Sequence, residues 1–271
     1  MKRIIRVFPY RTAFTPHDPL VYIGPPDFLI PEHDEVHISC VFSWDKPKCE
    51  ALAYQWEGFT NKPVKLGGVA YGSPVEDFTP GLYVRKGITF TSRGCNNNCP
   101  FCIVPKQEGR LRELPIVEGN IIQDNNFLQC SRTHKDKVFE MLKHQKEVEF
   151  KGGIEAELID DHFIQGIQGI HLKRLYLACD SEADVPAFKR GMAKLRAAGI
   201  SREKISCYCL SYGKEMEKDE ARARMIWDEG AIPFVQLYQK PAQTQTKYSA
   251  EWRDFQRRWS RPAIIRRIVK E

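Results

Sequence analysis

Three cysteines stand close together in one short polar segment of the chain. Residues Thr91 to Cys102 read TSRGCNNNCPFC, which places Cys95, Cys99 and Cys102 in the spacing Cys-x3-Cys-x2-Cys. Three thiolates at this spacing can bind three corners of an iron–sulfur cluster, and the lack of a fourth cysteine nearby leaves one iron open for catalysis. A structural zinc site usually has four ligands, so a zinc site and unliganded thiols are the less favoured interpretations.

A pair of glycines follows an apolar run further along the chain. Residues 148–150 form the run, and Gly152, Gly153, Ile154 and Glu155 come after it. Because glycine carries no side chain, a ligand can approach its backbone carbonyls closely. The same pattern is also compatible with a simple turn between a strand and a helix.

Acidic residues follow two other apolar runs. Asp124 comes after residues 120–123, and Asp180 comes after residues 175–179. The carboxyl ends of strands carry the active site in α/β folds, so either carboxylate could hold a hydroxyl group or orient a substrate. A helix cap or a loop hydrogen bond is the alternative for each.

The elements that must position these residues alternate along the chain. Apolar runs begin roughly 30 residues apart, the length of one strand-plus-helix unit. They occupy residues 87–91, 120–123, 148–150, 175–179, 205–210 and 232–238, and helical patterns occupy 135–146, 155–168, 186–198 and 214–229. The alternation predicts an α/β fold with six parallel strands covered by helices. Spacing alone does not choose between a partial barrel and an open, doubly wound sheet.

The chain divides into three parts on this pattern. Residues 1–84 form an N-terminal extension, residues 85–245 hold the six strands, and residues 246–271 form a basic, aromatic helical tail. The extension predicts a small βαβ piece, with strands at 36–42 and 64–70 and a helix at 47–56.

Positive charge gathers at both ends of the chain. Lysine and arginine number 41 against 35 acids, a net charge of +6. Four basic residues and no acid occur up to Arg11, and residues 251–271 hold seven basic and three acidic residues, so each end carries +4. These ends could contact nucleic acid, or they could be solvated surface. Trp252, Phe255 and Trp259 share one helical face, which predicts either core packing or stacking on a nucleic-acid strand.

Several classes of protein are excluded or disfavoured by composition. No stretch approaches the ~20 apolar residues that cross a bilayer, so we expect no membrane span. The first ten residues lack the apolar run of a secretory signal, and the nine cysteines, an odd number, argue against a disulfide scaffold. We therefore expect a cytoplasmic protein whose oligomeric state the sequence does not indicate.

Several motifs together resemble one enzyme superfamily. Besides the cysteine segment, they are Glu108-Gly109-x-x-Arg112-Glu113-Leu114-Pro115, Asp124-Asn125-Asn126-Phe127, Phe150-Lys151-Gly152-Gly153-Ile154-Glu155-Ala156, Cys179-Asp180 and Glu251-Trp252-Arg253-x-Phe255-Gln256-Arg257. With Cys-x3-Cys-x-aromatic-Cys after the first strand of the repeating part, the chain resembles the radical S-adenosylmethionine (SAM) enzymes. Within that superfamily it looks like a group found largely in phages and prophages, so a phage-encoded chain would act in the host cytoplasm.

The resemblance covers most of the chain and implies a fold, two cofactors and roles for particular residues. It implies a partial (β/α)6 barrel with a small N-terminal α/β extension, and a [4Fe–4S] cluster held by Cys95, Cys99 and Cys102. Phe101 is the aromatic position of the motif. The turn at Gly152 and Gly153 would contact the SAM amino group, with Glu155 one place later than the family's acid.

The two strand-end acids and the partners also receive expected roles from the resemblance. Asp180 is expected near the SAM ribose or the substrate, and Asp124 near the substrate. A flavodoxin- or ferredoxin-type protein would supply electrons.

The function implied is reductive cleavage of SAM to a 5′-deoxyadenosyl radical that takes a hydrogen atom from a substrate. The phage-like resemblance and the basic ends favour a modified nucleotide or a nucleic acid base as that substrate. One alternative is a methylthio- or methyl-transferring radical SAM enzyme, although only Cys40 and Cys49 precede the motif where an auxiliary cluster normally has three cysteines. The other is a non-enzymatic, metal-stabilised nucleic-acid-binding module.

Overall fold

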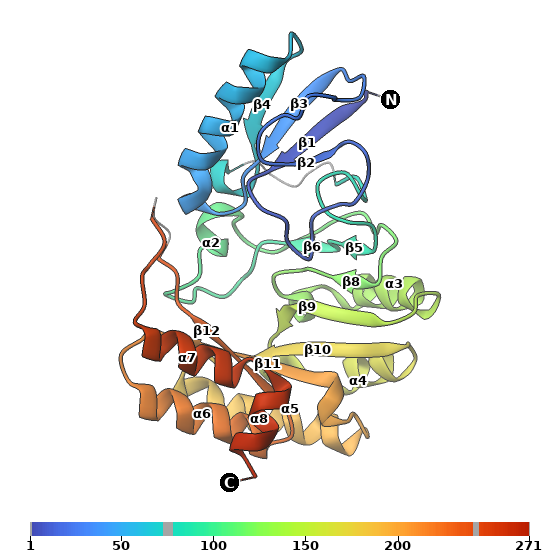
Figure 1. The fold of residues 1–271 in the computed structure, drawn as a ribbon. Coiled ribbons are helices and arrows are strands. Elements are labelled where there is room, and N and C mark those ends of the chain that lie inside the picture. The colour runs from blue at the N-terminus through green and yellow to red at the C-terminus, as the bar shows by residue number, and fades with distance from the viewer. Residues whose placement is uncertain (1, 73–77, 241–243, 271) are drawn as a thin grey trace. The chain divides into compact units, whose positions relative to one another are not determined.

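Two parallel sheets organise the chain, which a computed structural model describes over residues 2–72, 78–240 and 244–270. Two units result (Figure 1). The N-terminal unit comprises Met1–Ile88 and Lys240–Gln245, and the six-strand unit comprises Thr89–Gln239 and Thr246–Glu271. The predicted α/β class with parallel sheets is confirmed.

The N-terminal unit contains a parallel sheet of four strands in the order β2-β1-β3-β4. The strands are β1 (Ile4–Phe8), β2 (Val21–Ile23), β3 (Glu35–Ser39) and β4 (Val64–Gly67), with short 3₁₀ turns at Ser43–Asp45 and Val69–Tyr71. Helix α1 (Lys46–Phe59) packs its Leu52 and Trp56 against the apolar face of the sheet. The sequence predicted β3, α1 and β4 but not β1 and β2.

The basic residues at the start of the chain lie in or beside β1 and are paired with acids. Lys2 pairs with Glu35, Arg3 pairs with Glu32 at 3.1 Å, and the buried Arg6 pairs with Asp18 at 2.5 Å. The positive charge counted at this end is therefore largely matched inside the N-terminal unit.

The six-strand unit contains strands in the order β12-β11-β10-β9-β8-β5, which is the order of the chain in reverse (Figure 1). The strands are β5 (Ile88–Thr89), β8 (Ile121–Ile122), β9 (Val148–Ile154), β10 (Leu172–Ala178), β11 (Ile205–Ser211) and β12 (Ile232–Leu237). Neighbours from β8 to β12 pair in parallel, and each predicted apolar run overlaps one of the strands. Because the strand order never reverses, the sheet is not doubly wound.

Helices lie between these strands, and two more follow the last strand; the predicted helix at 155–168 begins only at Asp161. They are α2 (Val104–Gln107), α3 (Arg132–Lys143), α4 (Asp161–Gln168), α5 (Val185–Ala197), α6 (Met216–Asp228), α7 (Ala250–Trp259) and α8 (Pro262–Ile268). Short 3₁₀ turns lie at Phe127–Gln129, Ala156–Leu158, Glu182–Asp184 and Arg202–Lys204, and a two-stranded antiparallel piece pairs β6 (Ser92–Arg93) with β7 (Arg112–Glu113). Side-chain caps fix three helix starts: Ser131, Asp160 and Ser249 each accept a hydrogen bond from a backbone N–H in the first turn.

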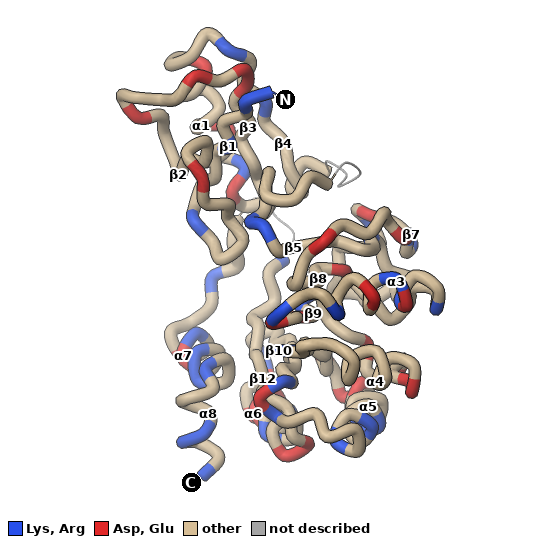
Figure 2. Tube along the Cα trace, turned by 90° about the vertical axis from the view of Figure 1, so that its right-hand side faces the viewer, with Lys and Arg blue, Asp and Glu red and all other residues tan. Residues whose placement is uncertain are grey.

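The C-terminal helices complete the core of the six-strand unit. Phe255 and Trp259 are fully buried, and the Ser260 hydroxyl donates to the carbonyl of Val235 in β12 at 2.7 Å. The core interpretation of the aromatic face is therefore confirmed for these two rings. Figure 2 shows lysine and arginine along α7 and α8, and Arg257 and Arg258 pair with Asp254 on the same helix.

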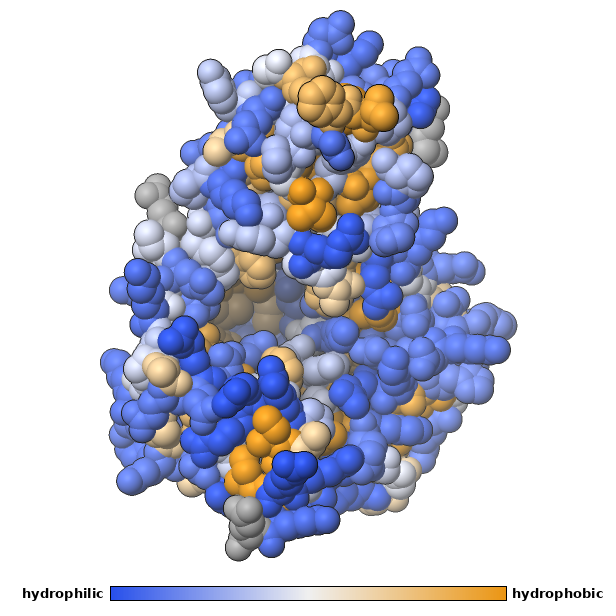
Figure 3. Space-filling view, in the orientation of Figure 1, coloured by the Kyte–Doolittle hydropathy of each residue, from blue (hydrophilic) through white to orange (hydrophobic). Residues whose placement is uncertain are grey.

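The face of the molecule drawn in Figure 3 is mainly hydrophilic, with hydrophobic residues in separate patches. Within the described ranges, no helix has the length and apolar character that a membrane span requires.

Candidate cofactor site

The cysteine loop leaves β6 through a glycine that no other residue can replace without strain. Gly94 has a φ of +78°, and a Cβ at this position would overlap the backbone carbonyl of Arg110. The N–H of Cys95 donates to the carbonyl of Gly109 at 3.1 Å. The start of the loop is thus fixed against the segment that leads into β7.

Glu108 holds the same part of the loop from the side. Its carboxylate pairs with the Arg93 guanidinium and accepts hydrogen bonds from the Gly94 N–H at 3.1 Å and the Asn125 amide at 2.6 Å. Arg93 is therefore paired with an acid of the same chain. Glu108 was quoted only as part of the family resemblance, and its role was not foreseen.

Asp124 lies behind the loop rather than at its open side. It is 1% exposed, and its carboxylate accepts from the Thr91 N–H at 2.6 Å, the Thr91 hydroxyl at 2.5 Å and the Ser92 hydroxyl at 2.9 Å. Burial raises the pKa of Asp124, and these hydrogen bonds oppose the rise. Asp124 therefore anchors the strand that leads into the cysteines, and contact with a substrate stays a prediction.

Glu155 connects the glycine turn to the cysteine loop. Its Oε2 accepts hydrogen bonds from three side-chain amides: Asn97 at 3.0 Å, Asn126 at 2.6 Å and Gln129 at 3.2 Å. Gln129 also accepts from the backbone N–H of Asn96 at 2.8 Å. Asn96 and Asn97 lie between Cys95 and Cys99, so two motifs far apart in the sequence meet here. No sequence signal singled out Gln129.

The two glycines before Glu155 differ in their surroundings. A Cβ on Gly152 would overlap the backbone carbonyl of Asp124, so this position is a close approach of two strands. Gly153 has a φ of +92°, and a Cβ built there has no atom within 4 Å. The space beside Gly153 is accordingly open, whereas Gly152 is closed in by Asp124, and approach of a ligand to this turn stays a prediction.

The three cysteines are partly exposed and near enough to influence one another electrostatically. Burial raises the pKa of the Cys99 thiol, and the charges of Cys102, Cys95 and Asp180 add to the rise. Burial also raises the pKa of the Cys102 thiol; a backbone hydrogen bond at Val104 opposes this, whereas the charge of Cys95 adds to it. A bound cation would relieve the repulsion among three thiolates.

The donor set has the chemistry that a [4Fe–4S] cluster requires, although the sulfur atoms are not arranged as ligands. Across residues 2–72, 78–240 and 244–270, no group of three or more His, Cys, Asp or Glu side chains could hold a metal ion.

Beside the loop, Asn126 Oδ1 is buried and has no hydrogen-bond partner among the described residues, which leaves an acceptor for an ammonium group. Phe101 lies partly exposed in the turn between Cys99 and Cys102.

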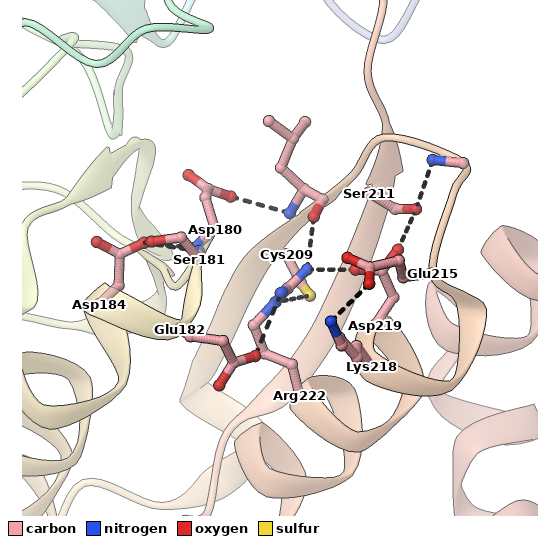
Figure 4. A network of polar contacts seen from close by, with 12 residues as sticks. Asp180, Ser181, Glu182, Asp184, Cys209, Ser211, Glu215, Lys218, Asp219 and Arg222 are labelled. Carbon is pink, nitrogen blue, oxygen red and sulfur yellow. Dashed lines mark hydrogen bonds and ion pairs between the residues drawn. The ribbon is translucent and has the colours of Figure 1, made fainter.

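Asp180 follows β10 and has a strongly perturbed carboxyl group. Its Oδ1 accepts from the Leu210 N–H at 2.9 Å, and Figure 4 shows its other oxygen pointing away from the network around Arg222. Arg222 is engaged with Asp219 at 2.7 Å and with Cys209 Sγ at 3.2 Å. Burial raises the pKa of Asp180 to about 6, Asp184 adds to the rise, and the Leu210 N–H and Arg222 oppose it.

Changing Asp180 to asparagine is expected to stabilise the protein at pH 7.5 and to have little effect near pH 4. The folded-state pKa of about 6 exceeds the ordinary value of 3.8, so the folded chain binds the proton more tightly. Stability therefore falls as pH rises through this window, and the whole penalty is present above it. Asparagine keeps the acceptor for Leu210 and removes the charge, which should increase the free energy of unfolding by about 2 kcal/mol at pH 7.5.

Urea unfolding at both pH values measures this effect, with the exposed Glu118→Gln as the matched loss of one negative charge. An equal gain for both variants, or a gain that does not change with pH, would show that the Asp180 carboxylate carries no burial penalty.

The remaining cysteines are buried. Cys130, Cys179, Cys207 and Cys209 lie in the core of the six-strand unit, and Cys40 and Cys49 lie in that of the N-terminal unit. Burial raises the pKa of Cys130 and Cys179 to about 12. All six are therefore small side chains of the two hydrophobic cores.

Comparison of the chain with family models and with curated proteins found no match. The chemistry of the site is therefore argued from its residues. A loop with three thiols, an open glycine backbone, an unpaired amide oxygen and a carboxyl group of raised pKa could together bind a metal cluster and a polar ligand.

Proposed function

We propose that the chain is a radical SAM enzyme. The observation that carries this proposal is the junction of two motifs through Asn97 and Glu155, whose side chains hydrogen-bond at 3.0 Å. The Cys-x3-Cys-x2-Cys loop and the Gly-Gly-Ile-Glu turn are separate in the sequence, and each alone is compatible with other functions. Their meeting at one edge of a sheet favours a common ligand.

The strand order supports a partial (β/α)6 barrel of the radical SAM type. Six strands follow one another across the sheet in chain order, with helices between them, as a barrel that is not closed requires. Active-site residues in such folds lie at the carboxyl ends of the strands, which is where the cysteine loop, Asn126 and Asp180 lie.

This chain's own residues would bind the cluster and SAM, orient the substrate and shield the cluster. Cys95, Cys99 and Cys102 would hold a [4Fe–4S] cluster, which with SAM supplies one electron and a carbon radical able to remove a hydrogen atom from a substrate. Asn126 Oδ1 and the open backbone at Gly153 would accept hydrogen bonds from the SAM amino group. Asp180 would accept from a ribose hydroxyl or a substrate hydroxyl, and Phe101 would cover the cluster side of the loop.

The composition of the chain bears on the class of substrate. A modified nucleotide or a nucleic acid base fits the basic composition, and a flavodoxin- or ferredoxin-type protein of the cytoplasm would be the electron donor.

Anaerobic reconstitution with iron and sulfide, followed by reduction and addition of SAM, tests the proposal. We expect 5′-deoxyadenosine and methionine, detected by mass spectrometry, and a rise in their formation when the right nucleoside or oligonucleotide is added. A protein that binds a cluster but leaves SAM intact under strong reductant would contradict the proposal, and binding of DNA without SAM cleavage would favour the metal-stabilised binding module.

A further inference from the structure

Exposed apolar side chains are concentrated in the N-terminal unit. Of 13 large hydrophobic residues that are exposed in the described chain, 11 belong to this unit and only Leu158 and Tyr212 belong to the six-strand unit. Figure 3 shows such residues on the surface of the N-terminal unit. Scattered exposed hydrophobic residues are normal, so the informative ones are those that gather at one place in the unit.

Five of these residues follow the carboxyl ends of three neighbouring strands. Tyr10 follows β1, Val41 and Phe42 follow β3, and Val69 and Tyr71 follow β4. The chain leaves β1 toward β2 at one edge of the sheet, and it leaves β3 toward β4 at the other edge. The point between β1 and β3 is therefore a topological switch point, where parallel α/β sheets bind ligands. We call Tyr10, Phe42, Trp44, Lys46, Lys48 and Tyr71 the aromatic edge.

Other side chains contact the rings of the aromatic edge but leave part of each ring exposed to solvent. Phe42 stacks on Trp44 with 4.7 Å between ring centroids and 7° between planes. Phe42 nevertheless remains 45% exposed, so part of its ring is available for a further stacking partner. Tyr10 is 54% exposed and Tyr71 is 36% exposed.

Two ammonium groups lie over two of these rings. Lys48 Nζ is 3.5 Å from the centroid of Tyr10, and Lys46 Nζ is 4.6 Å from the centroid of Tyr71. Each lysine thus carries a positive charge to the face of an aromatic ring. A complementary ligand would combine planar groups that stack on the rings with anionic groups that pair with the lysines.

Basic residues outnumber acids beside these rings, with Lys46, Lys48 and Arg11 against Asp45 and Glu50. Asp45 is buried at the start of α1; burial raises its pKa, and the charge of Lys48 lowers it. Glu50 accepts a hydrogen bond from the Tyr71 hydroxyl at 3.0 Å. Arg11 follows Tyr10 in the sequence and adds a third cation.

We propose that the aromatic edge binds single-stranded nucleic acid. The bases would stack on Phe42, Tyr10 and Tyr71, and the phosphates would pair with Lys46 and Lys48, which is the combination that single-strand-binding surfaces use. A duplex keeps its bases stacked on one another, so it offers these rings no free base. The proposal depends on the N-terminal unit alone and does not rest on the radical chemistry.

Fluorescence anisotropy with a labelled oligothymidine of about fifteen nucleotides tests the proposal on the full chain. We expect binding that weakens about tenfold or more between about 50 and 200 mM salt. Phe42→Ala and Tyr10→Ala should each weaken binding about fivefold or more. Both side chains are exposed, so neither change should affect folding.

Two matched controls separate the aromatic edge from general surface effects. Tyr54→Ala removes a still more exposed aromatic ring from α1, and Lys62→Gln removes an exposed lysine between α1 and β4. We expect both to bind as the unaltered chain does, whereas Lys48→Gln should weaken binding and flatten the salt dependence. The Cys95→Ala, Cys99→Ala, Cys102→Ala chain should bind the strand normally, which separates this result from that of SAM cleavage.

Three results would overturn the proposal. They are no salt-dependent binding of the oligothymidine, equal binding of a duplex of the same length, and unchanged affinity in both Phe42→Ala and Tyr10→Ala.

Discussion

Changing any one of Cys95, Cys99 and Cys102 to alanine is expected to abolish cluster binding and SAM cleavage together. The three thiols come from one loop; burial raises the pKa of Cys99 and of Cys102, and the charges of the neighbouring thiols add to both rises. Two remaining thiolates cannot satisfy a cluster that already has an open iron. Iron content should fall from about four atoms per chain to almost none, measured after anaerobic reconstitution and desalting.

Cys40→Ala provides the matched control because Cys40 is fully buried in the N-terminal unit, away from the cysteine loop in the sequence. It should keep its iron and its activity. Full iron in each single variant of the loop would refute the assignment of the ligands. About eight iron atoms in the unaltered chain, the content of two clusters, would instead support the methylthio-transferring alternative.

Gly152→Ala should prevent the six-strand unit from folding normally. A methyl group at this position would overlap the carbonyl of Asp124, a backbone atom that cannot move without displacing β8 from β9. Overpacking against backbone in a dense interior costs about 3 kcal/mol or more. The expected result is a low soluble yield and a urea midpoint well below that of the unaltered chain.

Gly153→Ala is the neighbouring comparison and should behave differently. Its φ of +92° strains an alanine by about 1 kcal/mol, but no atom lies within 4 Å of the added Cβ. The protein should therefore fold, while affinity for SAM falls because the methyl group narrows the open backbone. Equal urea midpoints for the two variants would show that the close approach at Gly152 does not exist in solution.

The parts of the fold that depend on local pattern could be predicted from sequence. The six apolar runs and the helices between them follow from periodicity, and the caps at Ser131 and Asp160 fit the residue types that favour helix starts. The three cysteines lie in one loop after β6, as their local spacing indicated, and their binding of a cluster stays a prediction.

The unforeseen features all depend on contacts between distant residues. β1 was obscured because Arg6 interrupts its apolar residues, and the ion pair with Asp18 and a hydrogen bond to the Ile4 carbonyl compensate for burial of the guanidinium. Asp124 is an acid after a strand, and nothing local indicates that its carboxylate turns back toward Thr91 and Ser92. The junction of Gln129 with Asn96 and Glu155 likewise exists only once the strand ends are brought together.

The sequential order of the six strands has a consequence for synthesis of the chain. Each strand from β8 to β12 emerges from the ribosome after the neighbour on which it pairs, so the sheet can grow one strand at a time with short loops to close. The growing edge is exposed at every stage and is a site where nascent chains could associate. Helix α7 packs against β12, and Ser260 then satisfies the Val235 carbonyl. Protection of the last strand therefore waits for the C-terminal helices, and chaperones would be most needed just before they emerge.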